Sequence, residues 1–251
     1  MKFLPLFGAS AAAALAISAA TAIATQPATP TGTVKGKVVF EGDKPEVKPL
    51  VIKEAQAEGC CDPGTEVDKG DRSLRIGDDG GIMDVVVALT AEGVKVEIPE
   101  APLVLDQSGC RFEPHVSVMP VGGTVQYLNS DSISHNVHTY ATKNEGLNKT
   151  VAAGGKMDQK LDKTEAVRVA CDIHPWMESH VYVTDATHFT VSAADGSFEL
   201  PDVPAGTYKL EIWHSKLGKG KGEVTVSEDG SSDMVEIKMG AKKKGGSRRR
   251  R

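Results

Sequence analysis

Apolar and polar residues alternate with a period of two over much of the chain, and the segment 83–90 contains a continuous apolar run at residues 85–89. Both patterns are typical of β-strands. The expected strands cover residues 33–40, 83–90, 116–119, 124–128, 167–170, 181–184, 189–192, 197–200, 207–213 and 234–239. Turn signals such as Asp195-Gly196 separate them. Helical periodicity is almost absent, so the pattern predicts an all-β protein.

The N-terminal segment has a different pattern from the rest. Lys2 is followed by an apolar run from Phe3 through Ala20 and then by small residues, which is the layout of a secretory signal peptide. We therefore expect residues 1–22 to lie outside the fold. No later stretch is long and apolar enough to span a membrane. The expected location of the mature chain is periplasmic or secreted.

Export changes the interpretation of the four cysteines. An oxidising compartment allows Cys60 or Cys61 to pair with Cys110, and which of the two neighbours takes part is left open. Cys171 would then keep its thiol. Full pairing of all four cysteines is the alternative, and it would consume Cys171.

Charge is unevenly distributed along the chain. The C-terminal segment 241–251 contains seven of the 29 Lys and Arg residues, and Lys2 would leave with the signal peptide. The rest of the chain has 34 acidic and 21 basic residues, which argues against nucleic-acid binding. We expect the basic segment to be a disordered, solvated tail. An electrostatic contact with an anionic envelope surface or an acidic partner is the alternative.

One short segment gathers the side chains of a metal site. Cys171, His174 and Met177 follow one another at intervals of three residues, and His135 lies 36 residues before Cys171. A thiolate, two imidazoles and a weak thioether form the ligand set that holds one copper ion for electron transfer. A turn is needed to bring the three loop residues to one side, because side chains alternate along a strand. Zinc does not favour a thioether. The predicted ligands are therefore His135, Cys171, His174 and Met177, and Asn136 is expected to hydrogen-bond to the ligand loop.

The other histidines are less informative. His115 and His180 could approach each other or a second metal ion, but buried histidines are more often structural and fully hydrogen-bonded. His138, three residues after His135, is expected to point away from the site. His188 and His214 fall in the C-terminal strands, where Trp213-His214 is expected to contribute packing and a surface contact. The sequence contains no His-x-His pair, so it lacks the ligands of a trinuclear copper oxidase centre.

The block 102–186 resembles the cupredoxins, the plastocyanin-type and amicyanin-type blue copper proteins. Residues 112–129 are similar to the paired strands before the first ligand, and the Cys-x-x-His-x-x-Met spacing is similar to the short amicyanin ligand loop. The resemblance implies a Greek-key β-sandwich with one type 1 copper ion. It also implies that electrons leave through an exposed edge of His174, next to a docking surface formed by Pro175 and Trp176.

The flanking blocks, 31–98 and 187–240, resemble the carboxypeptidase-regulatory-like family of small transthyretin-like or Ig-like β-sandwiches. The resemblance rests on the opening Gly32-Thr-Val, on Asp195-Gly-Ser-Phe198 and on Pro204-Ala-Gly-Thr-Tyr208. It implies one split sandwich into which the block 102–186 is inserted, and insertion at a surface loop is well tolerated. Taken whole, the chain resembles bacterial proteins labelled methylamine utilization protein.

These observations lead to one functional expectation and two alternatives. The expectation is an exported type 1 copper protein that carries single electrons between a redox donor and acceptor, with no catalytic residues and no enzymatic activity of its own. The first alternative is a copper carrier without redox turnover. The second is a structural β-sandwich that serves as an interaction module. Neither the donor nor the acceptor can be identified from the sequence, because a fold does not determine its partner.

Overall fold

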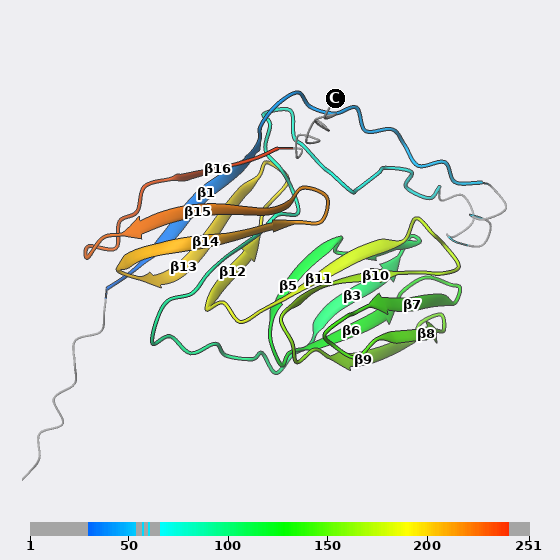
Figure 1. Ribbon diagram of the computed structural model, residues 1–251. Helices are drawn as coiled ribbons and strands as arrows, with labels where there is room; N and C mark the ends of the chain where they lie inside the picture. The colour runs from blue at the N-terminus through cyan, green and yellow to red at the C-terminus, as the bar shows by residue number, and fades with distance from the viewer. Residues whose placement is uncertain (1–29, 54–56, 58–59, 61–65, 241–251) are drawn as a thin grey trace, which may run out of the picture.

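The computed structural model describes residues 30–53, 57, 60 and 66–240. Sixteen β-strands form four sheets in this part of the chain, and these sheets are grouped into two sandwiches (Figure 1). The all-β prediction is confirmed. The predicted signal peptide and the basic tail lie outside the described residues, as does Cys61.

The first sandwich combines the N-terminal strands with the C-terminal strands. One sheet has the order β13-β1-β16 and the other has the order β12-β2-β14-β15. The strands are β1 (Thr31–Phe40), β2 (Val86–Leu89), β12 (His188–Val191), β13 (Ser197–Pro204), β14 (Gly206–His214), β15 (Gly218–Val226) and β16 (Val235–Met239). The two sheets share one buried apolar core that includes Val34 and Val38 of β1 and Ile212 of β14. Residues more than 150 positions apart thus build the same core.

The second sandwich is formed by the strands between β2 and β12. Its larger sheet has the order β5-β11-β10-β7-β8, and its smaller sheet has the order β4-β3-β6-β9. The strands are β3 (Leu103–Ser108), β4 (Arg111–Glu113), β5 (Val116–Pro120), β6 (Thr124–Asn129), β7 (His135–Tyr140), β8 (Leu147–Val151), β9 (Lys156–Lys160), β10 (Glu165–Ala170) and β11 (Glu178–Thr184). Its core is separate from the first and includes Tyr127 and Val169.

The chain between β1 and β2 connects the two sandwiches. Residues 41–53 run away from the first sandwich over the second, and the chain returns through residues 66–85 before β2 begins (Figure 1). Ile52, Ala57, Cys60 and Val67 of this excursion contribute to the core of the second sandwich. The second core is therefore completed by residues that precede β2.

The structure contains more strands than the sequence pattern predicted. All ten predicted strands correspond to observed ones, but β3, β4, β7, β8, β9 and β15 have no counterpart among them. In β9, the inward positions are only half-buried, and β15 begins Gly-Lys-Gly-Lys-Gly, so neither segment has the alternation of a half-buried strand. The sheet neighbours of these strands, rather than their own apolar residues, fix their conformation.

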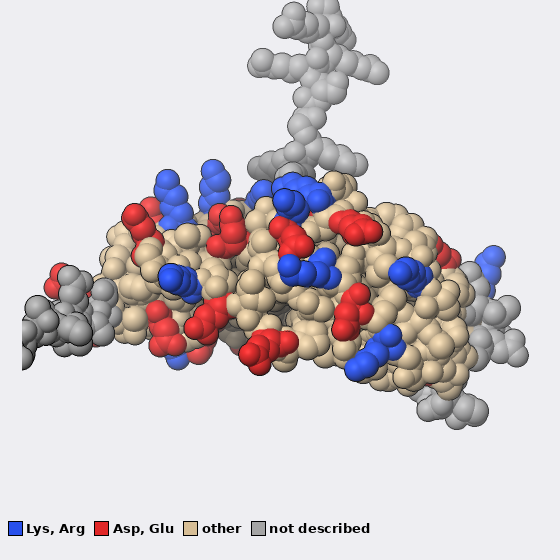
Figure 2. All heavy atoms as spheres, turned by 90° about the horizontal axis from the view of Figure 1, so that it is seen from below, with Lys and Arg blue, Asp and Glu red and all other residues tan. Residues whose placement is uncertain are grey.

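The surface carries both signs of charge. On the face shown in Figure 2, Lys and Arg side chains lie among Asp and Glu side chains. Among the described residues, no helix is long and apolar enough to cross a membrane.

Candidate metal centre

Two neighbouring strands bring His135 and Cys171 together. His135 is the first residue of β7, and Cys171 directly follows β10. The two strands are antiparallel neighbours, with Ala170 opposite His138. Because β7 and β10 are both interior strands of the larger sheet, the positions of the two side chains are fixed by the sheet.

The loop between β10 and β11 is closed by its own backbone. The Cys171 amide donates to the Met177 carbonyl at 3.1 Å, and the Met177 amide donates to the His174 carbonyl at 2.9 Å. These two bonds produce the turn that the spacing of three and three requires. His174 is thereby brought back over the end of the sheet.

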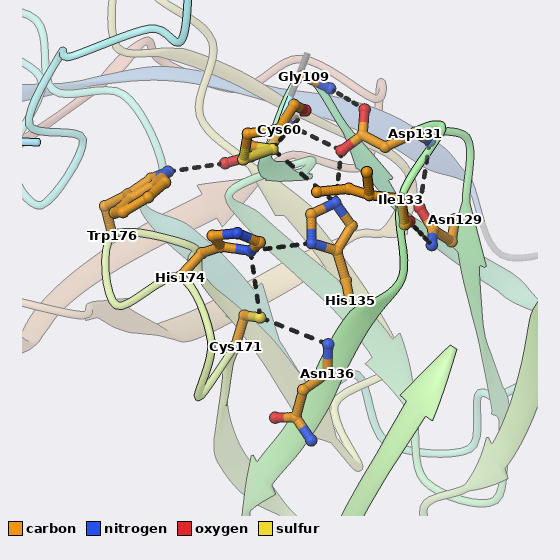
Figure 3. The surroundings of a disulfide bond; sticks show 11 residues. Cys60, Gly109, Asn129, Asp131, Ile133, His135, Asn136, Cys171, His174 and Trp176 are labelled. Atoms are coloured by element: carbon orange, nitrogen blue, oxygen red, sulfur yellow. Dashed lines mark hydrogen bonds and ion pairs between the residues drawn. A yellow bond between two sulfur atoms is a disulfide. The ribbon is translucent and has the colours of Figure 1, made fainter. Parts of the chain in front are cut away.

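Three side-chain ligand atoms converge at this end of the second sandwich. The His135 and His174 Nδ1 atoms are 3.1 Å apart, and His174 Nδ1 lies 3.8 Å from Cys171 Sγ (Figure 3). The three ligand atoms all lie within 4.8 Å of one another, and all three residues are buried. Two nitrogens and one sulfur at this spacing can enclose a single metal ion, whose bonds to nitrogen and sulfur are about 2.0 and 2.3 Å long.

Met177 ends the same loop and is completely buried. It belongs to the apolar core that also contains Cys171. The structure therefore places all four predicted ligands at one end of the second sandwich, with three of them in the compact group. The position of the fourth is fixed by the backbone bonds that join it to Cys171 and His174.

An acidic residue that the sequence did not single out orients His135. Asp131 Oδ2 lies 2.7 Å from His135 Nε2 (Figure 3). The same carboxylate accepts hydrogen bonds from the backbone amides of Gly109 at 2.6 Å and Cys110 at 2.9 Å. Because Nε2 is bound to the carboxylate, Nδ1 is left free to bind a metal, as is usual for histidine ligands. The only sequence signal for Asp131 was its position four residues before His135.

Asn136 connects the two halves of the site, as expected. Its backbone amide donates to Cys171 Sγ at 3.4 Å, and its side-chain Oδ1 accepts from the Asp172 amide at 3.1 Å. The side-chain amide in turn donates to Asn148 Oδ1 at 2.6 Å. The sulfur thus receives a hydrogen bond, which stabilises its thiolate form.

A disulfide bond lies directly beside the site. Cys60 pairs with Cys110, which confirms the predicted pairing and identifies the partner, and Cys171 is a free thiol. Cys110 Sγ lies 3.9 Å from His135 Nε2. The Cys110 carbonyl also accepts a hydrogen bond from the Trp176 indole at 3.2 Å (Figure 3). Sequence reasoning did not predict that the disulfide would contact the site.

The expected exposed edge of His174 is not observed. Only 6% of its surface is accessible, because the Trp176 ring lies 5.2 Å away between centroids and is held there by the Cys110 carbonyl. The exposed residues of the loop are instead Asp172, Pro175 and Ile173, the last of which is 54% exposed. The exposed apolar surface of the site is therefore formed by the residues on either side of His174, and not by His174 itself.

Electrostatics favour the thiolate. Burial raises the pKa of the Cys171 thiol, but hydrogen bonds with His135 and His174 outweigh this effect and lower it to about 6. Burial also lowers the pKa of His135, whereas its hydrogen bonds with Cys171 and Asp131 produce a net increase. At neutral pH the sulfur is therefore largely ionised, as a metal ligand must be.

The other predicted histidines take varied positions. His138 Nδ1 lies 3.0 Å from the Asp172 carboxylate, outside the metal-binding group, as expected. The rings of His115 and His180 lie 6.0 Å apart between centroids. His188 lies in β12. The surface contact expected for His214 is wrong, because this residue is only 1% exposed and its Nδ1 accepts hydrogen bonds from two backbone amides.

Comparison with known families gives one partial match. The family described as ER membrane protein complex subunit 7, beta-sandwich domain, matches residues 174–247. This range begins in the ligand loop, contains β11 to β16, and extends into the basic C-terminal segment. A search of curated proteins finds no match.

Solved structures with partial similarity include several copper proteins. A Cu-containing nitrite reductase from Thermus scotoductus SA-01 is 24% identical, with a TM-score of 0.32; the match covers 38% of this chain and 25% of the reductase. A single-residue mutant of amicyanin in the Cu(I) state is 20% identical with a TM-score of 0.32, covering 39% of this chain and 98% of amicyanin. A purple cupredoxin from Nitrosopumilus maritimus is 20% identical with a TM-score of 0.29, covering 33% of this chain and 99% of that protein. The chain thus spans a quarter of the nitrite reductase that it matches.

Proposed function

We propose that this protein is a type 1 copper protein that carries single electrons between redox partners and performs no catalysis of its own. The observation that carries the proposal is the buried group of His135 Nδ1, His174 Nδ1 and Cys171 Sγ, whose ligand atoms all lie within 4.8 Å of one another. Met177, buried at the end of the same loop, would supply the weak axial thioether.

The donor set fits copper better than zinc. Zinc in structural sites is bound by four Cys or His ligands, whereas a His₂Cys set with a weak thioether is typical of electron-transfer copper. When bound, copper would supply a reversible one-electron couple. The protein would supply a fixed geometry, so that little rearrangement accompanies the transfer.

Several contacts support a rigid site. His135 is fixed between β7 and the Asp131 carboxylate, and the ligand loop is closed by the two backbone bonds between Cys171, His174 and Met177. The Trp176 side chain is tied to the Cys110 carbonyl. A ligand set held in this way by sheet, loop and disulfide resists the changes in geometry that would slow electron transfer.

The exposed loop residues suggest where a redox partner would bind. Ile173 and Pro175 form an apolar surface on either side of the buried His174. Transient redox complexes use small interfaces. We place the docking surface for the electron donor or acceptor here.

The export proposed from the N-terminal sequence agrees with the Cys60–Cys110 disulfide, since disulfides persist in oxidising compartments.

The proposal is tested by removing single ligands. In Cys171→Ser and His135→Ala, we expect the copper-loaded protein to lose its blue colour and its reversible reduction by ascorbate, because the thiolate or an imidazole ligand is missing. His188→Ala, a change in β12 of the first sandwich, serves as the matched control and should keep both properties. Colour and reversible reduction that persist in Cys171→Ser would refute the proposal.

Binding of Cu(I) without reversible oxidation would instead indicate a copper carrier. Wild-type protein that binds no copper would leave the two sandwiches as an interaction module. Either result on the wild-type protein contradicts electron transfer as the function.

A further inference from the structure

A second pair of histidines lies between the two sandwiches. His115 precedes β5, and His180 is part of β11. The His180 amide donates to the His115 carbonyl at 2.9 Å, and the two rings meet edge to face with their centroids 6.0 Å apart. Their exposed fractions are only 6% and 8%. Trp213 of β14 in the first sandwich covers His180 at 5.6 Å between ring centroids.

Each of the two rings has one nitrogen without a partner. His115 Nε2 and His180 Nδ1 are both buried and form no hydrogen bond to any described residue. Unpaired buried polar atoms are rare in proteins, and each one calls for an explanation. In most structural histidines both ring nitrogens form hydrogen bonds. His115 and His180 therefore do not have the usual arrangement.

The partners of the other nitrogens identify the protonation state. His115 Nδ1 lies 3.0 Å from the Glu178 carbonyl, which can only accept, so the proton is on Nδ1. His180 Nε2 faces Glu178 Oε1 at 3.9 Å, which favours a proton on Nε2. Both unpartnered nitrogens therefore carry a free lone pair. Metal-binding histidines have this arrangement, with the other N–H directed at a carbonyl or a carboxylate.

The surroundings keep both rings neutral. Burial lowers the pKa of His115, and it lowers the pKa of His180 to about 4. The charged groups that act on the pair are Asp71, Asp84, Arg75 and Arg72 around His115, and Glu178 and Arg168 around His180. A neutral imidazole keeps its lone pair at physiological pH, so no proton competes for these two nitrogens.

The spacing of the rings suits a shared metal ion. Two imidazoles bound to one ion at about 2.0 Å have ring centroids roughly 5 to 6 Å apart, depending on the angle at the metal. The corresponding distance is 5.0 Å for His135 and His174 and 6.0 Å for His115 and His180. Both pairs meet edge to face.

We propose that His115 Nε2 and His180 Nδ1 form a second metal site, which binds a single zinc or copper ion at the seam between the two sandwiches. Imidazole suits both metals. His214 is close enough to His115 and His180 for both rings to act on its pKa. It is not a ligand through Nδ1, because that atom accepts hydrogen bonds from the Lys216 and Leu217 amides at 3.1 and 3.2 Å. Water or an added anion would complete the coordination. This site uses no residue of the Cys171 site and stands independently of the proposed electron transfer.

The test uses substitutions that each delete one lone pair and keep the neighbouring donor. In His115→Asn, the amide nitrogen takes the place of Nδ1 and can still donate to the Glu178 carbonyl, whereas Nε2 is lost. In His180→Gln, the amide nitrogen takes the place of Nε2, whereas Nδ1 is lost. Wild type, the double variant and the matched control His188→Asn are loaded separately with Zn²⁺, Cu²⁺ or Cu⁺, desalted, and analysed for metal per chain.

The proposal predicts that the double variant binds one equivalent of metal fewer than wild type and His188→Asn. The three loadings identify the metal. Equal metal content in all three proteins would overturn the proposal and leave a bridging water between the two nitrogens.

Unfolding in urea provides a second readout, which also checks that the variants fold. Zinc or copper should raise the urea midpoint of wild type above that of the metal-free protein by more than it does in the double variant. In the absence of metal, a cooperative urea transition of the double variant shows that it folds. An identical metal-dependent rise in both proteins would contradict the proposal.

The outcome of the metal analysis does not depend on the Cys171 site. If the Cys171 site binds no metal, the metal content of wild type should still exceed that of the double variant by one equivalent.

Discussion

At the scale of single residues, the candidate site depends on partners that hold its ligands. Asp131 is the clearest case, because one carboxylate binds His135 Nε2 and the amides of Gly109 and Cys110. It thereby determines which His135 nitrogen is free for a metal. A residue of this kind carries no motif, so the sequence predicted the candidate ligands but not the group that orients one of them.

The first prediction concerns this carboxylate. Asp131→Ala should weaken copper binding by about 10- to 100-fold, the usual effect of losing a group that orients a metal ligand. It should also lower the free energy of unfolding by about 1–3 kcal/mol, because two backbone donors lose their acceptor. Competition titration with a copper chelator measures the first effect and urea unfolding the second. Asp158→Ala, an exposed change in β9, is the control and should alter stability by less than about 0.5 kcal/mol. Equal copper affinity in both variants would contradict the assigned role.

A second prediction concerns the ionisation of Cys171 in the metal-free protein. Its pKa is lowered from 9.0 to about 6, so the folded state favours the thiolate. The resulting stabilisation is complete above the unfolded pKa near 9 and is lost as the pH falls through about 6. Relative to Cys171→Ser, the urea midpoint of wild type should therefore rise between pH 6 and 9. The ultraviolet absorbance of the thiolate, taken as the difference from Cys171→Ser, should titrate near pH 6; a midpoint near 9 would contradict the account.

At the scale of elements, the sequence was informative wherever one face of a strand is buried. The alternation in β1 and β14 and the apolar run in β2 identified strands of the first core, and the spacing in the ligand loop identified its turn. β9 and β15 were missed because most of their side chains are exposed or half-buried. Their conformation depends on pairing with β6 and β14, which a local pattern does not report.

The ligand loop shows the same limit of sequence reasoning. Its spacing predicted the convergence of Cys171 and His174, which the backbone bonds to Met177 produce. The burial of His174 was not predictable, because it depends on the Trp176 indole and a carbonyl 66 residues away in the sequence. Similarly, the sequence suggested that His115 and His180 could approach each other, but only the structure revealed that one nitrogen of each ring has no hydrogen-bond partner.

At the scale of the whole molecule, the disulfide joins the excursion between β1 and β2 to the second sandwich. Cys60 belongs to the excursion and Cys110 lies between β3 and β4. Nearby, Arg111 donates to the Gly70 carbonyl at 2.7 Å and to the Trp176 carbonyl at 3.3 Å. The candidate metal site is therefore enclosed partly by residues that precede β2. We propose that block 102–186 is an inserted domain whose site is completed by its host.

The third prediction follows from this connection. The disulfide closes a loop with a sequence separation of 50 residues, and Cys60→Ala/Cys110→Ala should lower the free energy of unfolding by about 4 kcal/mol. The copper site should also loosen, because Cys110 lies against His135. Urea unfolding and chelator competition measure the two effects. A variant with unchanged stability and copper affinity would show that the excursion does not support the site.

The most direct test of the central claim is the visible absorption and electron paramagnetic resonance spectrum of the Cu(II)-loaded protein, recorded before and after ascorbate. The account predicts an intense visible band from copper–thiolate bonding and a narrow copper hyperfine splitting, both abolished by reduction and restored by reoxidation. A protein that binds Cu(II) with neither the intense band nor the narrow splitting would contradict the assignment of Cys171 as a copper ligand.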